Sequence, residues 1–186
     1  LRRLSLAQSI IDDAGLAHVT NLQSLQFLDL DDTQVTSAGM ASIAELTHLE
    51  HLSVGTIDDS GLKHLGSLTN LRVLWLDGNR GATDAGARVL TNLPYLESLS
   101  FNGTGIGDQA LTHVPNPSGL KWLGLRGTGI TDAGLERVVG MTNLVQLGLM
   151  NTSIGDNGLA HLSELKNLKH LNLVGTKVTS AGLSHL

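Results

Sequence analysis

Leucine recurs at fixed positions along the whole chain, in short segments of the form Leu-x-x-Leu-x-Leu. Eight such segments begin at residues 1, 25, 49, 71, 96, 120, 144 and 168, which gives a period close to 24 residues. The first and fourth positions are always Leu, and the sixth is Leu, Val54 or Phe101. The alternation at the end of each segment predicts a short strand that directs the fourth and sixth residues into a core and leaves the residues between them facing solvent.

The second half of each repeat has a different pattern, as in the stretch ITDAGLERV at residues 130–138. Leu16, Val19 and Leu22 follow one another at three-residue spacing, which gives a short helix one apolar stripe to lay under the strand. A glycine column is filled in seven repeats and holds Ala110 in the other. Because glycine inside a helix is unfavourable, its recurrence indicates close packing between the backbones of neighbouring turns. Two residues before this column we predict helix N-caps at Asp13, Ser37, Asp59, Asp84, Asp108, Asp132, Asp156 and Ser180.

These two half-repeats together resemble the leucine-rich repeat family over the whole length of the chain. The resemblance implies an α/β fold, a horseshoe-shaped solenoid with about eight parallel strands on its concave side and short helices on its convex side. The T-D-A-G-L signature and the 24-residue period are similar to leucine-rich repeats of bacterial proteins and to those of F-box substrate receptors. The sequence contains no F-box-like segment. We expect a single domain over residues 1–186, with a truncated eighth repeat, and a longer parent protein because neither end has a polar cap.

Composition removes several classes of function. The 186 residues are 41% hydrophobic and only 3% aromatic, and the formal net charge is −5. The absence of Cys excludes disulfides, Cys-zinc sites and thiol catalysis. The sequence has no run of about 18 apolar residues, so we expect no membrane insertion. The acidic balance, with scattered Lys and Arg, argues against a nucleic-acid partner. The compartment cannot be predicted from these features.

Several short motifs suggest catalysis until they are placed in the repeat register. FLDLDDT, at residues 27–33, is similar to the start of a phosphatase site, but Asp29 and Asp31 occupy freely varying positions and only Thr33 recurs. The stretches DDSG (58–61) and GTGIGD (103–108) likewise fall in turn, cap and glycine columns. We therefore predict a protein that is not an enzyme and that has no cofactor. No metal site is expected in the histidine column, whose members do not converge: His18, His64, His113, His161 and His185.

The exposed positions of the strands have no architectural role, so they are the best candidates for a binding site. Trp75 and Trp122 lie on strands two apart, about 10 Å from each other, with Ser98 and Ser100 between them as a shallow floor. Exposed Trp with a nearby Arg is typical of a binding hot spot. The alternative is that the two Trp side chains only pack on each other or on neighbouring strands. The complete candidate set is Trp75, Trp122, Arg126, Asp77, Phe27, His51, Val73 and Met150.

These features predict a non-catalytic module for protein–protein interaction, which binds a protein or peptide on its concave sheet. Eight strands offer about 700 Å², close to one partner's share of a standard interface, which argues against a small-molecule substrate. The irregular repeats three and four, and Pro115 and Pro117, adjoin the strands that carry Trp. Alternative functions are carbohydrate or glycopeptide binding through a Trp-lined face, substrate recognition in a ubiquitin-ligase adaptor, and a spacer with no ligand.

Overall fold

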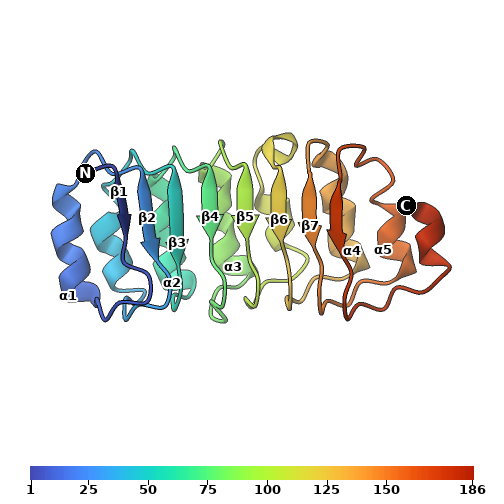
Figure 1. Cartoon of the computed structure of the whole chain (residues 1–186), viewed down its shortest axis with the longest axis horizontal. Helices are drawn as coiled ribbons and strands as arrows, with labels where there is room; N and C mark the ends of the chain where they lie inside the picture. Colours follow the sequence, from blue (N-terminus) through green and yellow to red (C-terminus); the bar gives the residue numbers. More distant parts are fainter.

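Eight parallel strands form one open sheet in chain order, β1 to β8, in a computed structural model that describes residues 1–186 (Figure 1). Neighbouring strands pair one repeat apart, as when Arg3 pairs with Phe27 and Phe27 with His51. The predicted leucine-rich repeat solenoid is therefore confirmed. The strands are β1 (Arg3–Ser5), β2 (Phe27–Leu30), β3 (His51–Val54), β4 (Val73–Trp75), β5 (Ser98–Ser100), β6 (Trp122–Gly124), β7 (Gln146–Gly148) and β8 (His170–Asn172).

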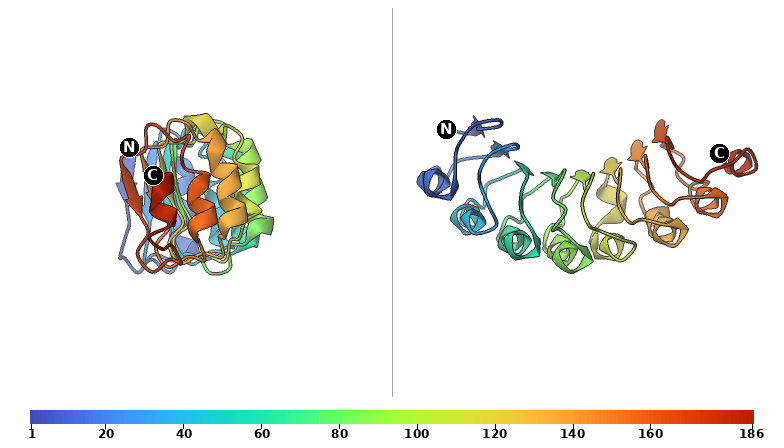
Figure 2. Two further views of the ribbon diagram at one scale, coloured as in Figure 1. Left: turned by 90° about the vertical axis from the view of Figure 1, so that its right-hand side faces the viewer. Right: turned by 90° about the horizontal axis from the view of Figure 1, so that it is seen from below.

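Short helices return the chain along the outer side of the arc, and the strands line its inner side (Figure 2). Five repeats contain an α-helical turn: α1 (Asp13–Leu16), α2 (Asp59–Leu62), α3 (Asp84–Ala87), α4 (Asp132–Leu135) and α5 (Asp156–Ala160). Most of these turns continue as 3-10 helix, whose three residues per turn suit the three-residue spacing of the apolar side chains. The 3-10 segments are η1 (Ala17–Asn21), η2 (Gly39–Ile43), η3 (Lys63–Ser67), η4 (Arg88–Asn92), η5 (Ala110–His113), η6 (Pro117–Gly119), η7 (Glu136–Gly140) and η8 (Gly182–His185).

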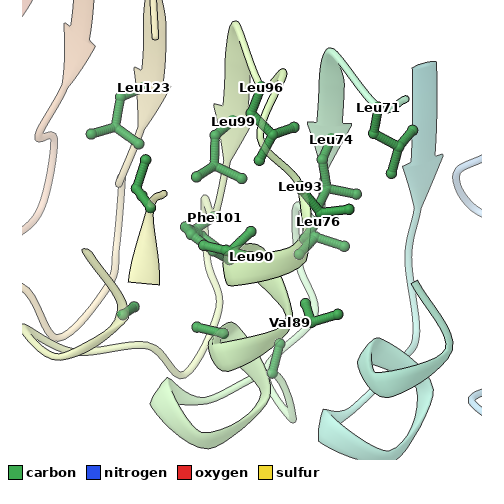
Figure 3. Close-up of a cluster of buried hydrophobic side chains, with 14 of the residues drawn as sticks. Leu71, Leu74, Leu76, Val89, Leu90, Leu93, Leu96, Leu99, Phe101 and Leu123 are labelled. Atoms are coloured by element: carbon green, nitrogen blue, oxygen red, sulfur yellow. The ribbon is translucent and has the colours of Figure 1, made fainter. Parts of the chain in front are cut away.

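A single hydrophobic core runs the length of the array between sheet and helices. It contains 45 buried residues, most of them leucines from the first, fourth and sixth positions of the repeats and from the convex turns. Phe101 is the largest fully buried side chain and takes the place that Leu76 and Leu125 hold in neighbouring repeats. Figure 3 shows it in one cluster with leucines of the adjacent strands and turns. No helix is long and apolar enough to cross a membrane.

The predicted N-caps are wrong by one position. In α1 and α2 the capping side chains belong to Asp12 and Asp58, and in α3 and α4 they belong to Thr83 and Thr131. The aspartate that we expected to cap each helix is instead the first helical residue. Its carboxylate turns away from its own helix, because donors of the next repeat lie within reach of it.

This aspartate column joins six of the seven pairs of neighbouring repeats, and between the second and third repeats the Ser37 hydroxyl accepts the backbone N–H of Asp58 instead. Asp13 accepts hydrogen bonds from the backbone N–H and the hydroxyl of Thr36, both at 2.7 Å. The same pair of bonds recurs between Asp59 and Thr83, Asp108 and Thr131, and Asp156 and Thr179. Where the next repeat has Gly107 or Gly155 at this place, Asp84 or Asp132 accepts from the backbone N–H alone. Each carboxylate thus accepts hydrogen bonds from donors in a turn of the next repeat. These donors take part in no hydrogen bond of a helix or strand.

At five of the seven glycines in the column, the carboxylate of the preceding repeat occupies the space that a side chain would need, whereas Gly15 faces Ile11 and Gly61 faces Ser37. A Cβ atom on Gly158 would lie 2.5 Å from Asp132 Oδ1 and 3.1 Å from Ile154 Cγ2. Equivalent clashes with the preceding aspartate arise at Gly39, Gly86, Gly134 and Gly182. The close packing that we predicted is therefore present, but the neighbour is an aspartate side chain and not only a backbone.

Gly158→Ala is expected to destabilise the fold by about 1–3 kcal/mol, because Asp132 must move and weaken its bond to Gly155. The sign is opposite to the gain of roughly 1 kcal/mol that this change gives in an open helix. Urea unfolding would measure the effect. Gly140→Ala is a matched control, since its new methyl would meet only Pro117, at 3.3 Å. A Gly158→Ala protein as stable as the parent would contradict this explanation of the column.

Asn79, in the fourth repeat, supplies hydrogen bonds to the third repeat, which is two residues shorter than a regular repeat. In five repeats the equivalent residue is Thr, whose hydroxyl donates to the carbonyl three residues earlier. Asn79 is buried and reaches back into the neighbouring repeat, where Nδ2 donates to Val54 O at 2.7 Å and Oδ1 accepts from Ile57 N at 2.5 Å. These bonds replace the ones that the two missing residues would have supplied.

Candidate binding surface on the concave sheet

Four ring-bearing side chains form a continuous row across the concave sheet, which we call the aromatic row: Phe27, His51, Trp75 and Trp122. Phe27 stacks on His51 with ring centroids 4.3 Å apart, and His51 meets the edge of Trp75 at 5.1 Å. The guanidinium of Arg3 lies over Phe27, 4.0 Å from the ring centroid. The row therefore runs from β2 to β6, with Arg3 of β1 at its end, and brings together side chains that the sequence placed only on separate strands.

The two Trp side chains lie much closer together than their strands. Their ring centroids are 6.3 Å apart, because Trp75 leans across β5 and its Nε1 donates to Ser98 Oγ at 3.1 Å. Trp122 lies over Gly124, where an added Cβ would be 2.7 Å from the ring. The predicted shallow floor of Ser98 and Ser100 between two separated Trp side chains is therefore wrong. That prediction used the spacing of the strands and did not include the length of the indole, which lets Trp75 reach across β5. Trp75 remains 39% exposed despite these contacts.

Asp77 and Arg126 stand beside the row but do not form an ion pair. Asp77 accepts hydrogen bonds from the Ser100 hydroxyl and from Asn102 Nδ2. Asn102 Oδ1 in turn accepts the backbone N–H of Arg126 at 2.8 Å. The two ion pairs of the chain join Glu97 to Arg72 and to Lys121, at the rim of the sheet. The guanidinium of Arg126 is left exposed and without a carboxylate partner.

Carboxylates collect next to the aromatic row over β2 to β4, and we call Asp29, Asp31, Asp32 and Asp77 the acidic flank. Burial is the main cause that raises the pKa of Asp31, and the charges of the other three add to it. The Ser53 hydroxyl, 2.7 Å from Asp31 Oδ2, works in the opposite direction. None of the four carboxylates forms an ion pair with a cation of the chain.

His51 adds no full positive charge to this surface at neutral pH. Burial lowers the pKa of its imidazole, and Arg3 adds to this effect while Asp29 opposes it. A neutral ring is also the form that stacks on Phe27 without a cost in desolvation. The concave positions of β2 to β5 therefore carry aromatic, acidic and small side chains, and neither Lys nor Arg.

The other candidate residues lie outside the centre of the row. Val73 is half-buried on β4 beside His51, to which it is paired in the sheet. Met150 is half-buried after β7. Sequence reasoning did not select the hollow over β6 to β8, which exists because Gly148 contributes no side chain. Its walls include Trp122, Gln146, His170, Asn172 and Val174.

No group of three or more His, Cys, Asp or Glu side chains is arranged to hold a metal ion. The four carboxylates of the acidic flank likewise do not converge on a common point where an ion could bind. The histidine column lies on the convex side, at the ends of the helical turns.

Asp31→Asn is expected to stabilise the fold at pH 7 by about 0.5 kcal/mol. A raised pKa means that the folded chain holds the proton more tightly than the unfolded chain, so stability is lost as the pH rises through the folded value. The amide oxygen can still accept the Ser53 hydroxyl. Thermal unfolding at pH 7 would measure the gain.

The gain should vanish at a pH below the ordinary value of 3.8 for Asp, where the parent carboxyl is protonated in both states. The hydroxyls of Ser37 and Ser60 are the main cause that lowers the pKa of Asp58 to about 2. Protonation of Asp58 therefore lowers the stability of both proteins as the pH falls. This opposite effect cancels in the difference. A gain that is equal at both pH values would show that charge is not its cause.

Parallel strands stacked in chain order, each returned by a helical turn, define this protein as a repeat solenoid. The family described as "Leucine-rich repeat region" matches residues 1–184 of the sequence, and the chain belongs to this family. Leucine-rich repeats commonly mediate protein–protein interaction. No curated protein matches the chain.

Solved structures share the fold. An internalin (inlF) from Listeria monocytogenes is 23% identical, with a TM-score of 0.72 over 100% of this chain and 58% of that one. An internalin C2 from the same species is 18% identical, with a TM-score of 0.75 over 98% and 75% of the two chains. The leucine-rich repeat ectodomain of the Arabidopsis thaliana membrane receptor kinase GASSHO1/SCHENGEN3 is 21% identical, with a TM-score of 0.66 over 100% and 23%. The chain thus spans little more than half of the first structure and about a quarter of the third.

Proposed function

We propose that the chain is a non-catalytic module that binds a protein or peptide on its concave sheet, with the aromatic row at the centre. The observation that carries this proposal is the exposure of Trp75. It is the one large hydrophobic side chain within a strand that is more than a third exposed. A side chain that only packed would be buried by its neighbours, whereas Trp at the centre of a surface is typical of binding hot spots.

Two further observations support this proposal. Curved repeat arrays bind through their concave surfaces, because that face is wide, continuous and free of structural duties. The plant receptor ectodomain with this fold was solved in complex with CASPARIAN STRIP INTEGRITY FACTOR 2. The 24-residue T-D-A-G-L subtype and substrate recognition in a ubiquitin-ligase adaptor remain predictions from the sequence.

Photo-crosslinking from two positions tests the proposal. A benzophenone side chain at Val73, on the concave face, should capture a partner from an extract of the source organism, and one at Tyr95 should not. Tyr95 is 56% exposed and lies between η4 and β5, outside the sheet. The capture should fall at least tenfold in Trp75→Ala, a loss of about 1.4 kcal/mol or more. Equal products from both positions, or no product from Val73, would refute concave binding.

Carbohydrate or glycopeptide binding is the second candidate function, and the hollow over β6 to β8 is the observation that favours it. Its wall combines an indole, Trp122, with amide and imidazole groups of Gln146, Asn172 and His170. Sugar rings stack on Trp, and their hydroxyls pair with such groups. A glycan array would detect binding that Trp122→Ala removes and that salt hardly changes.

A further inference from the structure

The aromatic row already holds a guanidinium, and this contact indicates which chemistry it accepts. Arg3 lies over the face of Phe27 at 4.0 Å. Aromatic faces attract cations, Trp most strongly, and Arg is the cation most often found there. Farther along the row, Trp75 is 39% exposed, and no Arg or Lys of the chain covers it. The most favourable ring for a cation is therefore the one left open.

The charges beside the row select a basic ligand over an acidic or neutral one. The acidic flank contains four carboxylates, and none of them takes part in an ion pair. Asp77 lies in the turn that follows β4, two residues beyond Trp75, and its carboxylate accepts hydrogen bonds from Ser100 and Asn102 of the next repeat. Arg3 lies over Phe27 at one end of this region, and Arg126 follows β6 at the other end. Arg2 and Arg72 lie at the rim of the sheet beside Phe27 and His51, where Arg72 is paired with Glu97. A ligand that lies across β2 to β4 meets aromatic rings on one side and carboxylates on the other.

We propose that this surface binds an arginine-bearing, extended segment of a partner protein, with guanidinium groups stacked on Trp75 and paired with the acidic flank. The inference rests on the proposed function, which it narrows from any protein or peptide to a basic one. Arginine fits better than lysine, because its planar group stacks on an indole and donates two parallel hydrogen bonds to a carboxylate.

The dimensions agree with a segment of a chain rather than with a single small cation. From β2 to β6 the row crosses four strand spacings, about 19 Å. An extended peptide covers this length with about six residues. A guanidinium bound here would also place positive charge beside carboxylates that form no ion pair within the chain.

Selection from a displayed library of random peptides of about seven residues tests this proposal, with the full chain as bait. Selected peptides should be enriched in Arg relative to the starting library. Replacing the enriched Arg by citrulline, which keeps the shape and removes the charge, should weaken binding at least tenfold in fluorescence anisotropy. Replacement by Lys should weaken it less, by about threefold to tenfold.

Two charge variants separate this site from general attraction to an acidic protein. Asp29→Asn/Asp31→Asn/Asp77→Asn should reduce affinity at least tenfold, and its fold should remain intact by circular dichroism. Glu45→Gln/Glu136→Gln/Glu164→Gln removes the same amount of charge from exposed convex positions without hydrogen-bonded or ion-paired side chains, and it should bind as the parent does. Equal loss in both variants, or in neither, would overturn the proposal.

The remaining outcomes distinguish this inference from the proposed function. Peptides that depend on Trp75 but lack Arg enrichment would overturn the arginine site and leave concave binding supported. Selected peptides whose binding survives Trp75→Ala would count against both. A selection that yields no binding peptide would overturn the arginine site alone, and the crosslink from Val73 would then decide whether a folded partner occupies the sheet.

Discussion

Phe101→Ala is expected to lower the free energy of unfolding by about 3–5 kcal/mol. The ring is fully buried in a core that continues on both sides into neighbouring repeats. Truncation removes apolar contacts and leaves a cavity, which the rigid sheet above it and the short turns below it cannot close. Because each repeat touches only its neighbours, the loss should concentrate in repeats four to six. Urea unfolding gives the total, and hydrogen exchange gives its distribution along the chain.

Phe101→Leu is the matched control, because Leu occupies this position in the repeats on both sides. We expect it to cost less than about 1.5 kcal/mol, since most of the volume is retained. If Phe101→Ala cost no more than Phe101→Leu, the repeat would have collapsed around the cavity. That result would contradict a stiff core at this point in the array.

Asn79→Ala is the second large effect, with an expected loss of about 3 kcal/mol. Two buried backbone groups, the carbonyl of Val54 and the N–H of Ile57, depend on this one side chain. Each buried polar group left without a partner costs about 1–3 kcal/mol. The loss is therefore that of two unsatisfied groups, and not that of one average hydrogen bond. Equilibrium unfolding in urea would measure it.

Thr152→Ala provides the comparison, because it removes a side chain from the same column in a regular repeat. Its hydroxyl makes one bond, to the carbonyl of Leu149 at 2.7 Å, so its loss should cost about 1 kcal/mol. Asn79→Ala should exceed it by at least 1 kcal/mol. Equal costs would mean that water reaches Val54 and Ile57 and that Asn79 has no special part in the short repeat.

Spacing was sufficient to predict the strands, because inward leucines at positions four and six leave no other pairing that buries every repeat. It was insufficient for the helix caps. Asp13 stands where a capping residue could stand, and only the stacking of repeats in space reveals that Thr36 of the next repeat receives its carboxylate. Asn79 was equally hidden, since its role depends on a deletion in the repeat before it.

On the concave face, the sequence could identify which residues face solvent but not how their side chains meet. An indole is longer than the strand spacing, so Trp75 reaches over β5 and contacts Trp122. No sequence rule fixes that rotamer. The acidic flank was visible in the sequence only as separate parts, with Asp29 and Asp31 in a false phosphatase motif and Asp77 among the candidate binding residues. Their proximity depends on how the repeats stack. The candidate residues Trp75, Trp122, Arg126, Asp77, Phe27, His51, Val73 and Met150 remain predictions for binding.

The aspartate junctions also bear on how such an array can change in length. Six of the eight repeats carry a carboxylate for the unit after them, and the unit that receives it supplies the backbone N–H of a Thr or Gly. A gene duplication that inserts one whole repeat therefore supplies both halves of each new junction, whereas an insertion of partial length supplies neither. Such a chain can grow or shrink by complete repeats without inventing an interface. The curvature then continues unchanged, and the concave surface widens by one strand at a time.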